Sequence, residues 1–141
     1  MKSARRRARE MTLQALYQWQ LSGQTTAFIE QQFVEGKDYA LADQNYFGLL
    51  FSGTVKEAPV LQAAITPYLD RKFSELSPVE CAILLLASYE LAYQIDIPYR
   101  VVINEAVELA KSFGGTDGHK YVNGVLDKLA AKVRSVEINA R

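Results

Sequence analysis

The stretch SPVECAILLLASYELAY, residues 77–93, decides the fold class of this 141-residue chain. Ser77 and Pro78 mark a helix start, because the serine hydroxyl can cap the first turn and proline fits the first helical position. Glu80 can then reach back to the backbone N–H of the capping residue. The residues from Ile83 to Ala87 are apolar on all sides of a helix, a pattern typical of a helix that other elements surround. The stretch therefore predicts the central and most buried helix of the fold.

Helical periodicity continues in both directions from this central segment, and no stretch has a convincing strand pattern. Helices are predicted over residues 4–21, 26–34, 41–58 and 59–68 before it, and over 103–113 and from 117 onward after it. Pro59 is expected to separate two of them, because proline suits the first turn of a helix and kinks its interior. Thr116 or Asp117 is expected to cap the last helix, and the tail after Ser135 is expected to fray.

Short loops, and the lack of any repeat, linker or low-complexity segment, indicate one domain over residues 1–141. Hydrophobic residues make up 49% and charged residues 23% of the chain, as in ordinary globular proteins. The predicted architecture is all-α, a single compact domain of about seven helices rather than a regular four-helix bundle.

Composition excludes several kinds of site and location. The single cysteine, Cys81, permits no intramolecular disulfide, and one cysteine with one histidine makes a structural zinc site implausible. Residues 11–29 carry no charge, but they include four glutamines and are too polar to span a bilayer. The basic N-terminus lacks the apolar core of a signal peptide. We therefore expect a cytoplasmic protein with no membrane partner, metal or cofactor.

The first ten residues concentrate positive charge, although the formal net charge of the chain is zero. The bases are Lys2, Arg5, Arg6, Arg7 and Arg9, against Glu10 alone. Such close like charges repel, and a helix start disfavours cations, so the cluster costs stability unless an anion relieves it. Arginine presents a planar fork of donors to phosphate oxygens and can stack on bases. The cluster suggests a phosphate-binding surface; the alternative is a solvated, partly disordered basic start.

A second polar cluster lies at the start of the last predicted helix, where Asp117, His119, Lys120, Tyr121 and Asn123 follow two glycines. Backbone N–H groups at a helix start attract anions, Lys120 adds a full charge, and Tyr121 offers a ring on which a base can stack. Asp117 can cap the helix or accept hydrogen bonds from a base edge. The alternative is purely structural, with His119 bonded within its loop and Asn123 a buried amide that holds neighbouring backbone.

Catalysis lacks a plausible set of residues. Nucleophilic catalysis needs a nucleophile, a base and an orienting group, and the only histidine is His119. Cys81 lies in an apolar helical run, where a free cysteine packs as a small hydrophobe. Residues 114–118 lack the lysine and the preceding strand of a phosphate-binding loop. The sequence therefore predicts a protein that is not an enzyme.

Five segments together are similar to one known family. They are ARRRARE at 4–10, QALYQWQ at 14–20, SPVECAIL at 77–84, DIPYRVVINEAVELAKSFG at 96–114 and DGHKYVNGVLDKL at 117–129. In this combination the chain resembles the NusB family of bacterial transcription antitermination factors. The resemblance implies an all-helical RNA-binding protein that pairs with the small ribosomal protein NusE. The pair would bind the single-stranded boxA element of nascent ribosomal RNA, and join other Nus factors on RNA polymerase to suppress premature termination.

The resemblance also assigns residues to two surfaces. The RNA surface would comprise Arg5, Arg6, Arg7, Arg9, Asp117, Lys120 and Tyr121, with Tyr17 and Gln18 as further candidates. The NusE surface would lie around the helix that begins at Ser77, with Glu80 as its main candidate and Leu84 as another. The chain departs from the family at Cys81 and Leu85, where members often carry basic residues, at Tyr121, where phenylalanine is usual, and at Gly118, where serine is common.

Two other functions stay open from the sequence alone. The chain could be a protein–protein adaptor whose basic helix docks on an acidic partner, or an RNA-recruiting module for ribosomal RNA modification. The RNA hypothesis also makes a spatial demand. It requires the first and last helices to lie side by side, and the ring of Tyr121 to be accessible.

Overall fold

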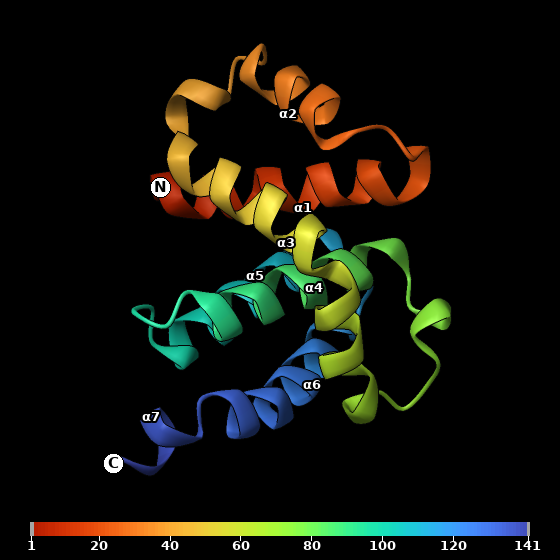
Figure 1. The fold of residues 1–141 in the computed structure, drawn as a ribbon, viewed down its shortest axis with the longest axis vertical. Coiled ribbons are helices and arrows are strands. Elements are labelled where there is room, and N and C mark those ends of the chain that lie inside the picture. Colours follow the sequence, from red (N-terminus) through yellow and green to blue (C-terminus); the bar gives the residue numbers. More distant parts are fainter. Residues whose placement is uncertain (1, 141) are drawn as a thin grey trace.

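The computed structural model describes residues 2–140, and every regular element within them is helical (Figure 1). The α-helices are α1 Ala4–Ser22, α2 Thr26–Val34, α3 Gln44–Ile65, α4 Pro78–Tyr93, α5 Tyr99–Phe113, α6 Gly118–Val133 and α7 Ser135–Asn139. Three short 3₁₀ helices, η1 Tyr39–Leu41, η2 Thr66–Tyr68 and η3 Phe73–Glu75, lie in the connections. The predicted all-α class is confirmed.

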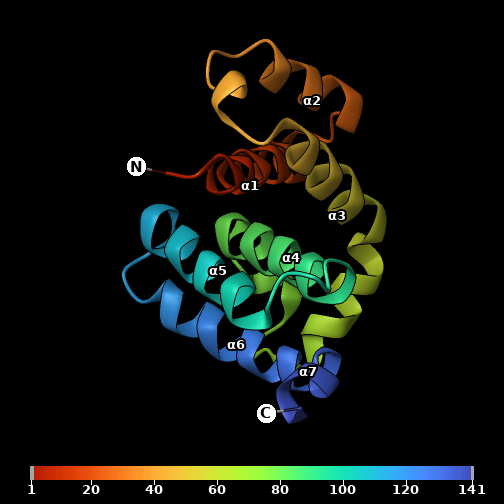
Figure 2. The same cartoon turned by 90° about the vertical axis from the view of Figure 1, so that its left-hand side faces the viewer.

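Helix α4 lies at the centre of the fold. It packs against α1, α3, α5 and α6, and every residue from Cys81 to Leu91 is buried. Figure 2 shows α1 and α2 above the pair α4 and α5, with α6 and α7 below that pair. The prediction of a central helix is confirmed, because a helix that is apolar all round is stable only when other helices cover each face.

Helix α3 corrects the prediction of two helices divided at Pro59. It runs unbroken from Gln44 to Ile65 with Pro59 inside it. Pro59 is exposed, so its ring lies on the solvent side of the helix and does not disturb the packing of the core. The inner face of α3 packs closely on α4 at Gly53. There is no room for a side chain at this position, because a Cβ added to Gly53 would lie 2.3 Å from the hydroxyl oxygen of Tyr89.

The residues around the last two helices also differ from expectation. Asp117 occupies the N-cap position of α6, but neither it nor Thr116 caps the helix with its side chain. Asp117 instead pairs with Lys120 at 3.6 Å on the exposed surface. The tail after Ser135, expected to fray, forms α7, and Ile138 packs against the hydrophobic core.

Arg134 ties this C-terminal segment to the end of α4. Its side chain is buried, and its guanidinium donates to the backbone carbonyls of Leu91 at 2.7 Å, Gln94 at 3.1 Å and Glu90 at 3.3 Å. The same guanidinium pairs with Glu137, which also accepts a bond from the backbone N–H of Tyr99 at 2.9 Å. Arg134 therefore supplies a donor to the Leu91 carbonyl, which the end of the helix leaves without a backbone partner, and adds a second donor to the carbonyls of Glu90 and Gln94, which already accept from the backbone N–H groups of Gln94 and Ile97.

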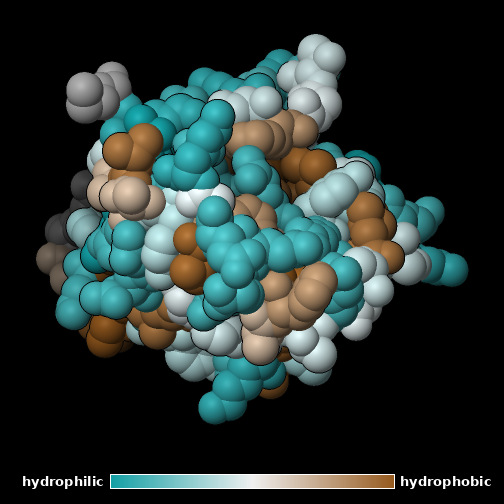
Figure 3. Space-filling view, turned by 90° about the horizontal axis from the view of Figure 1, so that it is seen from above, coloured by the Kyte–Doolittle hydropathy of each residue, from teal (hydrophilic) through white to brown (hydrophobic). Residues whose placement is uncertain are grey.

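The surface mixes polar and apolar side chains. Seen from the α2 side, hydrophobic residues form separate patches between hydrophilic ones (Figure 3). Across residues 2–140, no helix combines the length and the apolar character that crossing a membrane would require.

Candidate nucleic-acid interface

The arginines of α1 differ sharply in what they contact. Ser3 caps the helix, with its Oγ accepting from the backbone N–H of Arg6 at 3.0 Å. The Arg6 guanidinium forks onto Glu105 of α5, with Nε to Oε1 at 3.0 Å and Nη2 to Oε2 at 2.6 Å. Hydrogen bonding from Arg6 lowers the pKa of Glu105, so the carboxylate stays ionised at neutral pH.

Arg9 is buried, with 4% of its surface exposed. Its Nε donates to both carboxylate oxygens of Glu90, at 3.0 and 3.1 Å, and its Nη2 donates to Oε2 at 2.8 Å. The hydroxyl of Tyr46 donates to the same carboxylate, and Glu105 lies 3.4 Å from Arg9 Nη1. In this conformation Arg9 is part of the core and is closed to a phosphate.

Arg5 is exposed and Arg7 is half-buried. The Arg5 guanidinium stacks 4.0 Å from the ring centre of Tyr46 and is 3.5 Å from Asp43 Oδ2. Within residues 2–140, Arg7 makes no ion pair with a carboxylate. Carboxylates at the start of α3 and on α4 and α5 therefore relieve the repulsion expected for Arg5, Arg6 and Arg9.

The start of α6 exposes some of the predicted residues and covers others. Lys120 and Asp117 have side chains 74% and 76% exposed. Tyr121 is half-buried, with its hydroxyl accepting from the backbone N–H of Asp70 at 3.3 Å and the Arg71 guanidinium 4.3 Å from its ring centre. Burial raises the pKa of Tyr121. Arg71 thus already stacks on the ring that the sequence analysis assigned to a base.

Three other candidates can be placed. His119 is half-buried, and Asn123 is exposed and bonds Asp127 at 3.3 Å, so the alternative of a buried Asn123 amide is wrong. Tyr17 is 41% exposed. Gln18 donates to Gln24 at 2.7 Å and Gln32 at 2.6 Å, and so is engaged with the α1–α2 region.

The expectation that the first and last helices lie side by side is wrong. Helix α1 packs mainly on α2, α3 and α4, whereas α6 packs mainly on α5 and α4. Figure 2 nevertheless shows the end of α5 and the loop into α6 on the same side of the molecule as the N-terminus. Phe113, at the end of α5, lies against the N-terminal region, because it lines one hollow with Lys2 and Arg7 and a second with Tyr17.

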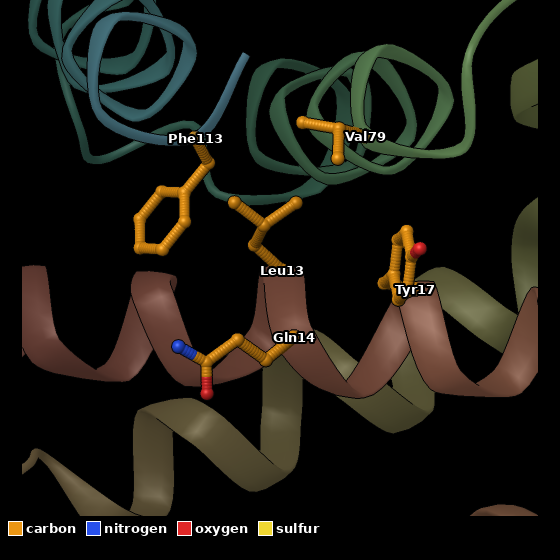
Figure 4. Close-up of a pocket in the computed structure, with 5 residues that line it drawn as sticks. All are labelled: Leu13, Gln14, Tyr17, Val79 and Phe113. Atoms are coloured by element: carbon orange, nitrogen blue, oxygen red, sulfur yellow. The ribbon is translucent and has the colours of Figure 1, made fainter.

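The second hollow is a groove between α1, the start of α4 and the end of α5 (Figure 4). Its volume is about 220 Å³, and it is lined by Leu13, Gln14, Tyr17, Val79 and Phe113. The sequence analysis did not predict this site: it placed Phe113 only as the last residue of a helix, whereas its side chain is 38% exposed and lines the groove. The sequence did hold one signal for this exposure, because Phe113 stands directly before two glycines, where the helix ends.

The predicted partner surface around the start of α4 is partly buried. Ser77 Oγ accepts from the N–H of Glu80 at 3.1 Å and donates to a Glu80 carboxylate oxygen at 3.2 Å, so the serine caps as predicted. The Glu80 side chain bonds the serine hydroxyl rather than the backbone N–H that was expected. Leu84 has 0% exposure, so in this conformation a partner protein cannot contact its side chain.

Cys81 and Leu85, the family departures on this helix, are also core residues. Their exposed fractions are 6% and 3%. Burial raises the pKa of the Cys81 thiol to about 11, so it stays protonated. Neither side chain changes the charge of the exposed surface at the start of α4.

Comparison with known proteins agrees with this architecture. Residues 6–131 match the model of the NusB family. The transcription antitermination protein NusB of Cupriavidus pinatubonensis is 57% identical over 140 residues, covering 99% of this chain and 84% of the relative. The NusB of Ralstonia pickettii is 56% identical, covering 99% and 90%.

Solved structures of NusB proteins have the same fold as this chain. T. maritima NusB superposes with a TM-score of 0.81 at 31% identity, covering 94% of each chain. A crystal structure of the antitermination factors NusB and NusE in complex with dsRNA superposes with a TM-score of 0.75 at 25% identity, covering 88% of this chain and 93% of that one. The matched family model, the full-length relatives and the shared fold together establish that the chain belongs to the NusB family.

Proposed function

We propose that this chain acts in transcription antitermination in the cytoplasm, by binding single-stranded boxA-type RNA jointly with NusE and joining other Nus factors on RNA polymerase. Family membership carries the proposal, and a related complex of NusB and NusE with dsRNA supports NusE and RNA as the kinds of partner. The proposed NusE surface is the exposed start of α4 around Ser77 and Glu80.

The proposed RNA surface follows the side of the molecule that joins the start of α1 to the start of α6. Arg7 and Arg5 would supply phosphate contacts at one end, and Lys120 would supply one at the other. Arg6 would supply a further phosphate contact once its guanidinium is partly released from the Glu105 carboxylate. Arg9 is left out, because its guanidinium is buried against Glu90.

Arg7→Ala is expected to weaken binding of boxA RNA about tenfold, the order of one lost charge-assisted hydrogen bond. The slope of log affinity against log salt should become shallower by about 0.7, as for one phosphate contact on a single strand. A titration of labelled boxA and scrambled RNA, with and without NusE, measures both. Lys132→Ala, which removes an exposed cation near the far end of α6, is the matched control. Equal loss in both variants, or an unchanged slope for Arg7→Ala, would count against a specific phosphate contact.

Glu105→Gln is expected to tighten RNA binding about threefold, because the Glu105 carboxylate competes with phosphate for Arg6, and a part-exposed ion pair is worth roughly 0.5–1 kcal/mol. The salt slope should steepen at the same time. Glu108→Gln makes the same change in net charge on an exposed position of α5 and serves as the control. If the two variants tighten binding equally, the effect is one of overall charge and Glu105 does not compete.

A further inference from the structure

A groove with exposed aromatic walls opens beside the cationic start of α1. Leu13, only 2% exposed, forms its floor, while Tyr17 and Phe113 are 41% and 38% exposed. Figure 4 shows Leu13 pointing from α1 toward the gap between Phe113 and Val79, with Tyr17 beside Val79. Exposed aromatic faces above an apolar floor are the surroundings in which single-stranded bases stack.

The hollow next to this groove carries charge. Gln14 and Phe113 belong to both hollows, and the second also includes Lys2, Arg7 and the carboxylates of Glu10 and Asp38. Lys2 is paired with Glu10 at 2.9 Å, whereas Arg7 makes no ion pair within the described part of the chain. A free guanidinium thus borders an aromatic groove, as a nucleotide with its phosphate and base side by side would require.

Gln14 lies at the junction of the two hollows. It is exposed, and within residues 2–140 its amide makes no hydrogen bond. An unengaged amide offers both donors and an acceptor to the edge of a base. An apolar side chain from a protein partner would use the groove but neither Gln14 nor Arg7.

We propose that this groove holds one nucleobase of the bound RNA strand, stacked on Phe113 and Tyr17 with its edge on Gln14, while Arg7 binds the adjacent phosphate. The inference rests on the proposed function and adds to it a base-binding site formed by α1, α4 and α5. It also predicts that the base at one position of the RNA contributes much more to the binding affinity than the bases at neighbouring positions.

The test combines Phe113→Ala with RNAs that carry a single abasic nucleotide at each position in turn. Phe113→Ala is expected to weaken binding of intact boxA RNA about tenfold, the order of one lost base stack. At one position of the RNA, an abasic nucleotide should weaken binding to the wild-type protein by the same factor of about ten. The same abasic RNA should bind Phe113→Ala no more weakly than intact RNA does. Phe28→Ala removes another exposed phenylalanine, on α2, and should leave binding unchanged. Tyr17→Ala repeats the test on the other wall, should Phe113→Ala fail to fold.

Other outcomes separate this inference from the proposed function. If Phe113→Ala and Tyr17→Ala bind intact RNA as wild type does while Arg7→Ala loses salt dependence, RNA binding stands and the base site is overturned. If the two aromatic variants weaken binding of NusE and leave RNA binding alone, the groove holds a protein side chain and the inference is likewise overturned. If the wild-type chain with NusE does not distinguish boxA from scrambled RNA, the proposed function itself fails.

Discussion

Glu90→Gln is expected to lower the free energy of unfolding by about 3–5 kcal/mol, the cost of removing one partner from a buried ion pair. Glu90 is 2% exposed and accepts bonds from Arg9 and from the hydroxyl of Tyr46. The neutral amide keeps the shape of the side chain but leaves the Arg9 charge in the core without its main counter-ion. Chemical denaturation followed by circular dichroism measures the loss.

The exposed pair of Lys2 and Glu10 provides the control for this prediction. Its atoms approach to 2.9 Å, but the lysine is 51% exposed, so Glu10→Gln should cost less than about 1 kcal/mol. The triple variant Arg9→Met, Glu90→Leu, Tyr46→Phe removes all three polar groups together. It should recover much of the stability, because no buried charge or hydroxyl is left unpaired. A Glu90→Gln protein as stable as the Glu10→Gln control would contradict the role given to the buried pair.

Arg134→Met is expected to lower the free energy of unfolding by about 3 kcal/mol, because a buried charged donor of several hydrogen bonds is removed. The carbonyl of Leu91 at the end of α4 would lose its donor, the Gln94 carbonyl would keep only the backbone N–H of Ile97, and Glu137 would lose its ion pair. Methionine fills similar space, so the change reports mainly on polar contacts. Thermal and chemical unfolding measure the stability, and amide hydrogen exchange measures protection in α7.

Lys132→Met makes the same change in charge two residues earlier on an exposed position of α6. It should alter the free energy of unfolding by less than about 0.5 kcal/mol, as for ordinary surface substitutions. Faster exchange confined to α7 in Arg134→Met, with no loss of global stability, would show that Arg134 anchors only the C-terminal turn and does not support the end of α4.

Much of the fold was predictable because its signals are local. The helix start at Ser77-Pro78 and the helix end at residue 113 depend on residues within one helical turn, and both agree with the structure. The prediction at Pro59 was wrong for the opposite reason. Whether a proline ends a helix depends on where its ring points, and here buried residues on both sides of Pro59, Thr54 before it and Leu61 after it, keep α3 packed on the core.

The candidate site was less predictable, because neighbouring arginines of α1 differ in which side chains from distant parts of the sequence they contact. The sequence by itself determined the helical order, the central buried helix and the concentration of cations in the first ten residues, all of which are written in short-range patterns. Only the tertiary structure decided which arginines are available, since Arg6 and Arg9 meet carboxylates 99 and 81 residues away in the chain. It also brought Phe113 against α1, because helix packing joins side chains that no local periodicity relates.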